Sequence, residues 1–188
     1  MNTTYLLTQL GFAATTIVYS WLFLRQLHKS LKATNFPEER KKRILRGTTL
    51  ALIGWAVLTG ILSLSGFLGD FSSFPPKMMI VLIVPLTAIL WMVSTKTTKE
   101  ILLHTPAETI IGLQSFRVFV EILLWMLFIT KLAPIQMTFE GRNLDIISGI
   151  TAPLIAFLVY RKKLSMMWTI VWNVACLALL ANIVITAI

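Results

Sequence analysis

Apolar residues dominate six stretches of the chain, and short polar segments separate them. A helix that crosses roughly 30 Å of hydrocarbon needs about 20 apolar residues. The pattern therefore predicts membrane-spanning helices at 5–27, 45–68, 76–95, 109–130, 145–160 and 166–188. None of these stretches alternates apolar and polar residues as a barrel strand does. We expect an all-α protein, with six transmembrane helices bundled into a single transmembrane domain over residues 1–188.

The composition agrees with a membrane protein. Of the 188 residues, 56% are hydrophobic and 13% are charged, and the mean hydropathy is +0.80. About a quarter of the residues in soluble domains are charged, so this low share of charged residues excludes a soluble enzyme and a disordered chain. The single cysteine, Cys176, excludes an intrachain disulfide and a thiolate metal cluster.

The basic residues predict the orientation of these helices. Of the 17 Lys and Arg residues, 14 lie in or beside the segments that follow the first, third and fifth spans, with Arg117 counted among them. Lys77, Lys131 and Arg142 lie in the other segments. Because cytoplasmic loops carry the excess of positive charge, both the N-terminus and the C-terminus are expected outside the cytoplasm.

Eight of the basic residues lie in or beside the segment 28–45, between the first two spans. Leu24, Leu27 and Leu31 continue the first helical pattern beyond the lipid, and Pro37 suits an early start for the second helix. We therefore expect a basic, cytoplasmic helical hairpin over about 28–45. Its expected partners are anionic lipid headgroups at the cytoplasmic face and not nucleic acid. The eight residues are Arg25, Lys29, Lys32, Arg40, Lys41, Lys42, Arg43 and Arg46.

Local patterns predict one helix start and several packing faces. The run 105–108, Thr-Pro-Ala-Glu, has the form of a capping box and predicts that the fourth helix begins near Pro106. Small residues at four-residue spacing favour close helix packing in lipid. They are Gly47 with Ala51, Ala56 with Gly60, and Ser148 with Ala152 and Ala156.

Polar residues inside the fourth span form the first candidate site. Gln114, Arg117 and Glu121 lie at offsets 0, 3 and 7 and share one helix face. A charge at this depth needs a partner, a proton or water. In a structural interpretation, Arg117 and Glu121 neutralise each other, together with Asn173 of the sixth span. In a functional interpretation, the same residues line a wet cavity and bind a substrate, a proton or an ion.

The outer loop before the fifth span holds the second candidate site. The run 138–145 contains Glu140, Arg142, Asn143 and Asp145. In one interpretation Asn143 caps the helix and Arg142 bridges Glu140 and Asp145. In the other, these four residues form the outer mouth of a cavity that leads to Glu121.

Motifs of catalysis are absent from the sequence. It contains no glycine-rich phosphate loop, nucleophile elbow, HExxH motif or acidic metal cluster. We therefore predict no catalytic residue, no metal site and no cofactor, which disfavours an enzyme. A membrane-embedded enzyme that modifies lipid, with Glu121 or Asp145 as its base, is the weakest option kept open.

Part of the C-terminal half resembles a known family. The runs 112–117 (GLQSFR), 120–121 (VE), 137–146 (MTFEGRNLDI) and 149–153 (GITAP) resemble uncharacterised bacterial polytopic membrane proteins. The resemblance implies a multi-pass protein of the bacterial inner, or plasma, membrane and brings no established activity. Members of that family continue beyond a sixth span, so both a shortened and a full-length chain stay open.

Two functions remain open at this stage. The leading hypothesis is a small transporter or channel-like protein with its central polar site on the fourth span. The alternative is a non-transporting membrane subunit or scaffold that binds lipid, a protein partner or a second copy of the chain.

Overall fold

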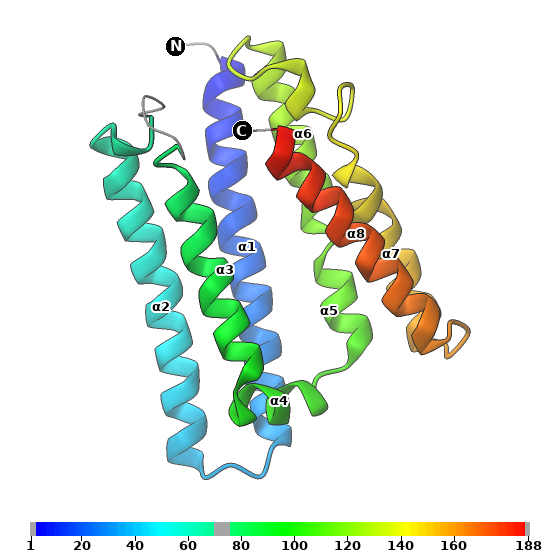
Figure 1. The fold of residues 1–188 in the computed structure, drawn as a ribbon. Helices are drawn as coiled ribbons and strands as arrows, with labels where there is room; N and C mark the ends of the chain where they lie inside the picture. The colour runs from blue at the N-terminus through cyan, green and yellow to red at the C-terminus, as the bar shows by residue number, and fades with distance from the viewer. Residues whose placement is uncertain (1–2, 70–75, 187–188) are drawn as a thin grey trace. The chain divides into compact units, whose positions relative to one another are not determined.

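The computed structural model describes residues 3–69 and 76–186, and all regular elements in these ranges are helical (Figure 1). The chain divides into two compact units. Unit 1 comprises residues 1–23 and 106–188, and unit 2 comprises residues 24–105. The long first helix, α1 (Thr3–Ala33), contributes its first part to unit 1 and its last part to unit 2.

Unit 1 is organised around one short helix that carries small residues. Ser148, Gly149 and Ala152 of this helix are buried, and it packs against the two helices before it and the one after it. Besides the start of α1, the elements are α5 (Ala107–Leu113), α6 (Phe116–Ile129), the 3₁₀ turn η2 (Ile135–Met137), the central helix α7 (Asp145–Tyr160) and α8 (Met166–Thr186). The small-residue face predicted at Ser148, Ala152 and Ala156 is therefore a packing face.

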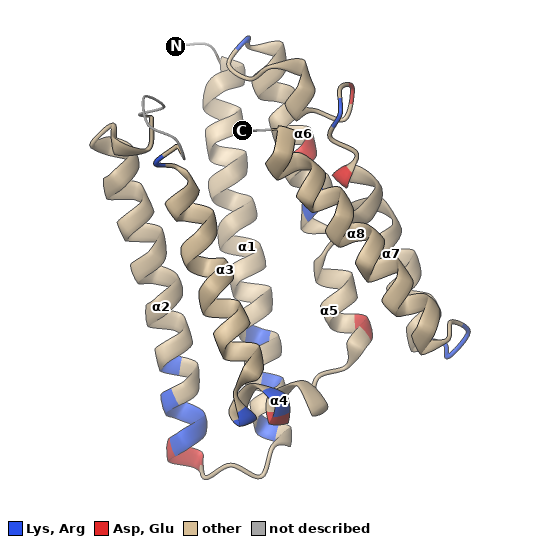
Figure 2. Ribbon diagram, viewed as in Figure 1, with Lys and Arg blue, Asp and Glu red and all other residues tan. Residues whose placement is uncertain are grey.

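Unit 2 contains the end of α1 and four further elements. These are α2 (Glu38–Leu64), the 3₁₀ turn η1 (Phe67–Gly69), α3 (Met79–Ser94) and α4 (Lys96–Leu103). Only residues 34–37 separate α1 from α2, and the basic, cytoplasmic hairpin over 28–45 stays a prediction. Lys and Arg gather at the end of α1, at the start of α2 and on α4 (Figure 2).

The predicted capping box at the start of the fourth span is wrong. The helix α5 begins at Ala107, and no side chain caps it. The Thr105 hydroxyl makes its contacts within unit 2 instead, where it lies 2.8 Å from both the Ser30 hydroxyl and the Ile101 carbonyl oxygen. The side chain of Thr95 does cap a helix, since it accepts a hydrogen bond from the Thr98 N–H at the start of α4 (3.2 Å).

Four helical stretches of the described residues are long and apolar enough to cross a membrane: α1, α2, α5 with α6, and α8. A fifth is added if α3 and α4, which are bent by 78°, form one broken span. The helix α7 spans 145–160 as predicted, but its 16 residues are fewer than such a crossing usually needs. A multi-pass helical fold is confirmed, whereas the six-span count stays a prediction.

Two predicted spans differ from the helices observed. The second span was expected to reach residue 68, but α2 ends at Leu64 because the chain turns at Gly66, which has a φ of 75°. The fourth span was expected to be one helix, but it is interrupted between α5 and α6. Around the interruption, the Arg117 N–H donates to the Gln114 carbonyl oxygen three residues earlier (3.2 Å), which tightens the turn without ending the span.

The exposed surface of the helices is apolar. Large apolar side chains are exposed on α1, α2, α3, α7 and α8, whereas a soluble protein of this size would bury most of them. Examples are Ile17, Leu50, Trp91, Leu154 and Leu177. Since helices satisfy their own backbone hydrogen bonds, such a surface suits a hydrocarbon environment.

Candidate functional site

The charged residues of α6 pair with the start of α7. Arg117 lies in the first turn of α6, and its guanidinium forms an ion pair and a hydrogen bond with the carboxylate of Asp145, the first residue of α7. Both side chains are largely buried, at 13% and 6% exposure. The predicted direct neutralisation of Arg117 by Glu121 is therefore wrong, because Asp145 from the neighbouring helix binds the guanidinium instead.

Glu121 lies one turn after Arg117 and pairs with an amide. Its side chain is 2% exposed, and its Oε1 accepts a hydrogen bond of 2.7 Å from Asn143 Nδ2. The same Asn143 nitrogen also donates to the Met137 carbonyl oxygen (3.0 Å). The Asn143 Oδ1 accepts from the Asp145 N–H (3.1 Å), but the N-cap position of α7 is Leu144 and not Asn143 as predicted.

The residues predicted as an outer mouth separate into two groups. Asn143 and Asp145 are buried beside Glu121 and the half-buried Arg117, whereas Glu140 and Arg142 are exposed. The predicted bridge from Arg142 to Glu140 and Asp145 is wrong, since no such ion pair is present in the described residues.

Glu140 and the Arg142 backbone have other partners. The Glu140 carboxylate accepts a hydrogen bond of 2.9 Å from Trp125 Nε1, and the Trp125 ring stacks on Phe139. The Arg142 carbonyl oxygen accepts from Asn182 Nδ2 of α8 (2.7 Å). These contacts hold the loop before α7 against α6 and α8.

The other end of the predicted polar stripe contacts α8. Gln114 Nε2 donates to Asn173 Oδ1 (3.1 Å), and Asn173 Nδ2 donates to the Thr169 carbonyl oxygen of its own helix (2.9 Å). Gln114 and Asn173 therefore connect the α5–α6 junction to α8, while Arg117 and Glu121 face α7. The stripe that the sequence predicts as one site is divided between two neighbouring helices.

We define the α6–α7 cluster as Arg117, Glu121, Asn143, Asp145 and Ser148. Ser148 lies one turn after Asp145 and is 1% exposed, and the sequence indicated it only as a small packing residue. The ionised cluster holds one positive and two negative charges. Glu121 is left without a cation of its own because Arg117 pairs with Asp145. A charge buried in this way needs compensation from a bound group or a proton.

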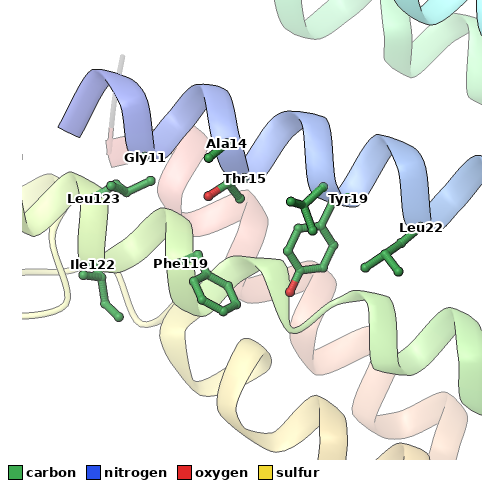
Figure 3. Close-up of a pocket in the computed structure, with 9 residues that line it drawn as sticks. Gly11, Ala14, Thr15, Tyr19, Leu22, Phe119, Ile122 and Leu123 are labelled. Atoms are coloured by element: carbon green, nitrogen blue, oxygen red, sulfur yellow. The ribbon is translucent and has the colours of Figure 1, made fainter. Parts of the chain in front are cut away.

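A second feature of unit 1 is a pocket of about 390 Å³ between α1 and α6 (Figure 3). Its walls are almost wholly apolar, and Tyr19 and Thr15 bring the polar atoms visible in the close-up. The lining residues are Gly11, Ala14, Thr15, Val18, Tyr19, Leu22, Phe119, Ile122 and Leu123. Sequence reasoning missed this pocket, although the small residues Gly11, Ala14 and Thr15 at helical spacing were a signal for it.

The length and hydropathy of the helices define the class of the protein. Helix length and hydropathy make it an integral membrane protein that crosses the membrane more than once. The described residues contain no group of three or more His, Cys, Asp or Glu side chains able to hold a metal ion. No protein-family model, curated protein or solved structure matches the chain.

Proposed function

We propose that the chain is a non-transporting membrane subunit that holds the hydrocarbon chain of a membrane lipid between α1 and α6. The observation that carries this proposal is the apolar pocket of about 390 Å³ in unit 1. That volume lies within the range of small-molecule pockets, which are lined mainly by hydrophobic side chains.

Two contacts join α1 to the α5–α6 stretch beside the pocket. In the first, Gly11 lies so close to Leu123 that a Cβ at position 11 would overlap the leucine side chain. In the second, the Tyr19 hydroxyl lies 3.1 Å from the Ser115 hydroxyl, and the Tyr19 ring packs edge-on against Phe116. The pocket of about 390 Å³ beside these contacts leaves room for an apolar group.

The surroundings of the pocket favour an alkyl chain as the occupant. Val18 of α1, and Phe119 and Ile122 of α6, line the pocket and are exposed apolar residues. A mouth flanked in this way opens to hydrocarbon in a membrane. An empty pocket would lose the dispersion contacts of its walls, whereas a lipid tail restores them.

The α6–α7 cluster supports a structural role for the polar residues of the fourth span. Arg117 and Asp145 pair directly, and Asn143 connects Glu121 to the start of α7. A transport site would have to break these contacts or open beside them during each cycle. Residues buried as deeply as Glu121 and Asn143 instead suit the fixed connection of two helices.

The basic hairpin of unit 2 favours a second contact with lipid. Lys and Arg cluster where α1 ends and α2 begins (Figure 2). In the topology proposed from the charge bias, this end faces the cytoplasm, where each nearby Lys or Arg gains about 1 kcal/mol from anionic headgroups. The hairpin would then orient the chain at the membrane surface.

A pocket-filling variant tests the lipid proposal. Ala14→Phe places a ring in the pocket, and Ile17→Phe places the same ring on the exposed face of α1. Both proteins would be incubated in bilayers with a phospholipid that carries a photoreactive group on its acyl chain. We expect Ala14→Phe to lower crosslinking to 119–123 at least several-fold and Ile17→Phe to leave it unchanged. Equal crosslinking in both variants would count against the pocket as a lipid site.

A small transporter is the second candidate function. One observation favours it, namely that Glu121 Oε2 is buried without a hydrogen-bond partner. The Glu121→Cys variant, made in a Cys176→Ser background, separates the two functions. Reaction with a membrane-impermeant thiol reagent in a folded protein would favour an aqueous path and a transporter, whereas protection would favour the non-transporting subunit.

A further inference from the structure

Three buried polar atoms of the α6–α7 cluster have no hydrogen-bond partner, and they are the only such side-chain atoms in the described parts of the chain. They are Arg117 Nε, Glu121 Oε2 and Ser148 Oγ. Buried polar atoms are nearly always satisfied by protein or by ordered water. Three exceptions within one cluster are therefore unusual.

The helices bring these three atoms to one interface. Arg117 and Glu121 are one turn apart on α6. Ser148 is one turn after Asp145, the residue of α7 that binds Arg117, and so it lies on the same face of α7. The backbones are close at this level, because a Cβ built on Gly149 would lie 3.1 Å from Arg117 Cβ and 2.7 Å from Val118 N.

The chemistry of the three atoms selects a partner that could satisfy all three. Arg117 Nε only donates a hydrogen bond, an ionised Glu121 Oε2 only accepts one, and the Ser148 hydroxyl can do either. A metal cation would leave the Arg117 N–H unpaired. An anion would be repelled by Glu121 in a cluster that already holds an excess of negative charge. A water molecule accepts from the first atom and donates to the second, and it can bind the third in either direction.

We propose that the α6–α7 cluster is a binding site for internal water, held by Arg117 Nε, Glu121 Oε2 and Ser148 Oγ. The water connects Arg117 to Glu121. The two charges, one turn apart on α6, therefore interact through water, while Asp145 binds the guanidinium directly. A buried water of this kind typically makes two to four hydrogen bonds and is part of the structure. This inference does not depend on the lipid pocket or on transport.

Solid-state NMR of the full chain in lipid bilayers tests the site directly. The experiment transfers magnetisation from water to ¹³C-labelled protein. Ala152 provides the control, because it lies one turn after Ser148 on α7, is fully buried and has no polar side-chain atom. We expect the signals of Glu121 Cδ and Ser148 Cβ to build up several-fold faster than the Ala152 Cβ signal. Build-up at Glu121 no faster than at Ala152 would overturn the proposal.

A Ser148→Ala variant provides a second test through the sign of its effect on stability. If the cluster is dry, removing an unpartnered buried hydroxyl leaves the thermal midpoint unchanged or raises it. If Ser148 holds water, the variant loses a hydrogen bond, its midpoint falls, and water transfer to Glu121 weakens. Ser94→Ala is the control, because the Ser94 hydroxyl is exposed and bonds its own helix at the Leu90 carbonyl oxygen (3.0 Å). An unchanged midpoint together with unchanged magnetisation transfer from water to Glu121 would show that Ser148 does not bind the water.

Discussion

Asp145 is the only acidic residue paired with Arg117 in the described structure, so it neutralises the one cation of the α6–α7 cluster. A buried ion pair is costly to desolvate, so its presence adds little net stability over an apolar pair. Its loss is different, because removal of one partner leaves the other charged and buried. The effect of the ion pair on the free energy of unfolding can therefore be measured by removing one of its charges or both.

We expect Asp145→Asn to lower the free energy of unfolding by about 3–5 kcal/mol, the usual cost of leaving a buried charge unpaired. The double variant Arg117→Leu with Asp145→Leu should recover most of that loss, because neither charge remains. Denaturant titration in bicelles would measure both. A single variant as stable as the wild type would show that Arg117 finds another partner.

The exposed pair of Lys41 with Glu38 is a matched control in the basic hairpin. Its side chains lie 2.9 Å apart, but that of Glu38 is 74% exposed. Glu38→Gln is the same carboxylate-to-amide change as Asp145→Asn. Because water screens the exposed pair, no measurable change of stability is expected from it.

The partners of individual residues are the part of the site that the sequence could not predict. The offsets of Gln114, Arg117 and Glu121 predicted one polar face, but the break between α5 and α6 leaves Gln114 bonded to α8 and the other two bonded at the start of α7. The choice of Asp145 as the partner of Arg117 depends on how α7 packs against α6. Spacing along one helix carries no information about that contact.

At the scale of elements, the contact between α6 and α7 depends on Gly149. An added Cβ would lie 2.7 Å from both the backbone nitrogen and the Cγ2 of Val118. The backbone of α6 cannot move aside as a flexible side chain could, so a larger residue would force the two helices apart. This contact also positions Arg117 opposite Asp145.

We therefore expect Gly149→Ala to destabilise the protein by about 1–3 kcal/mol, the usual cost of overpacking a close interface. Gly54→Ala on α2 is the control, since nothing lies within 4 Å of a Cβ at that position. There the better helix propensity of Ala should leave stability equal or higher by up to about 1 kcal/mol. Thermal unfolding of both variants in the same detergent would measure the difference, and equal midpoints would contradict the close packing.

The hydropathy pattern predicted the helices better than their interruptions. The helix at 145–160 has the predicted bounds, and the hairpin at 28–45 was expected from Pro37 and the leucine spacing. The break between α5 and α6 was not expected, because Gln114 and Ser115 are compatible with a helix interior. Both residues instead bond to other helices, Gln114 to Asn173 and Ser115 to Tyr19. Interactions of this kind arise only after the helices have packed.

At the scale of the whole molecule, the distribution of charge determines the proposed topology. The sequence-based count assigned Arg117 to the cytoplasmic loops, but its side chain is paired with Asp145 within unit 1. The bias survives without Arg117, because the remaining basic residues still concentrate in the segments after the first, third and fifth predicted spans. The positive-inside rule counts loop charges and not buried ones, so this correction leaves the predicted orientation unchanged.

The orientation can be measured at the two ends of α7 with single cysteines in a Cys176→Ser background. Arg142 precedes α7 and Lys163 follows it, and both side chains are exposed, unlike Asp145. If both termini lie outside, Arg142→Cys should react with an impermeant thiol reagent in intact cells, and Lys163→Cys should react only after permeabilisation. The reverse pattern would invert the topology and place the basic hairpin outside. Reaction of both cysteines in intact cells would show that α7, with only 16 residues, does not cross the membrane.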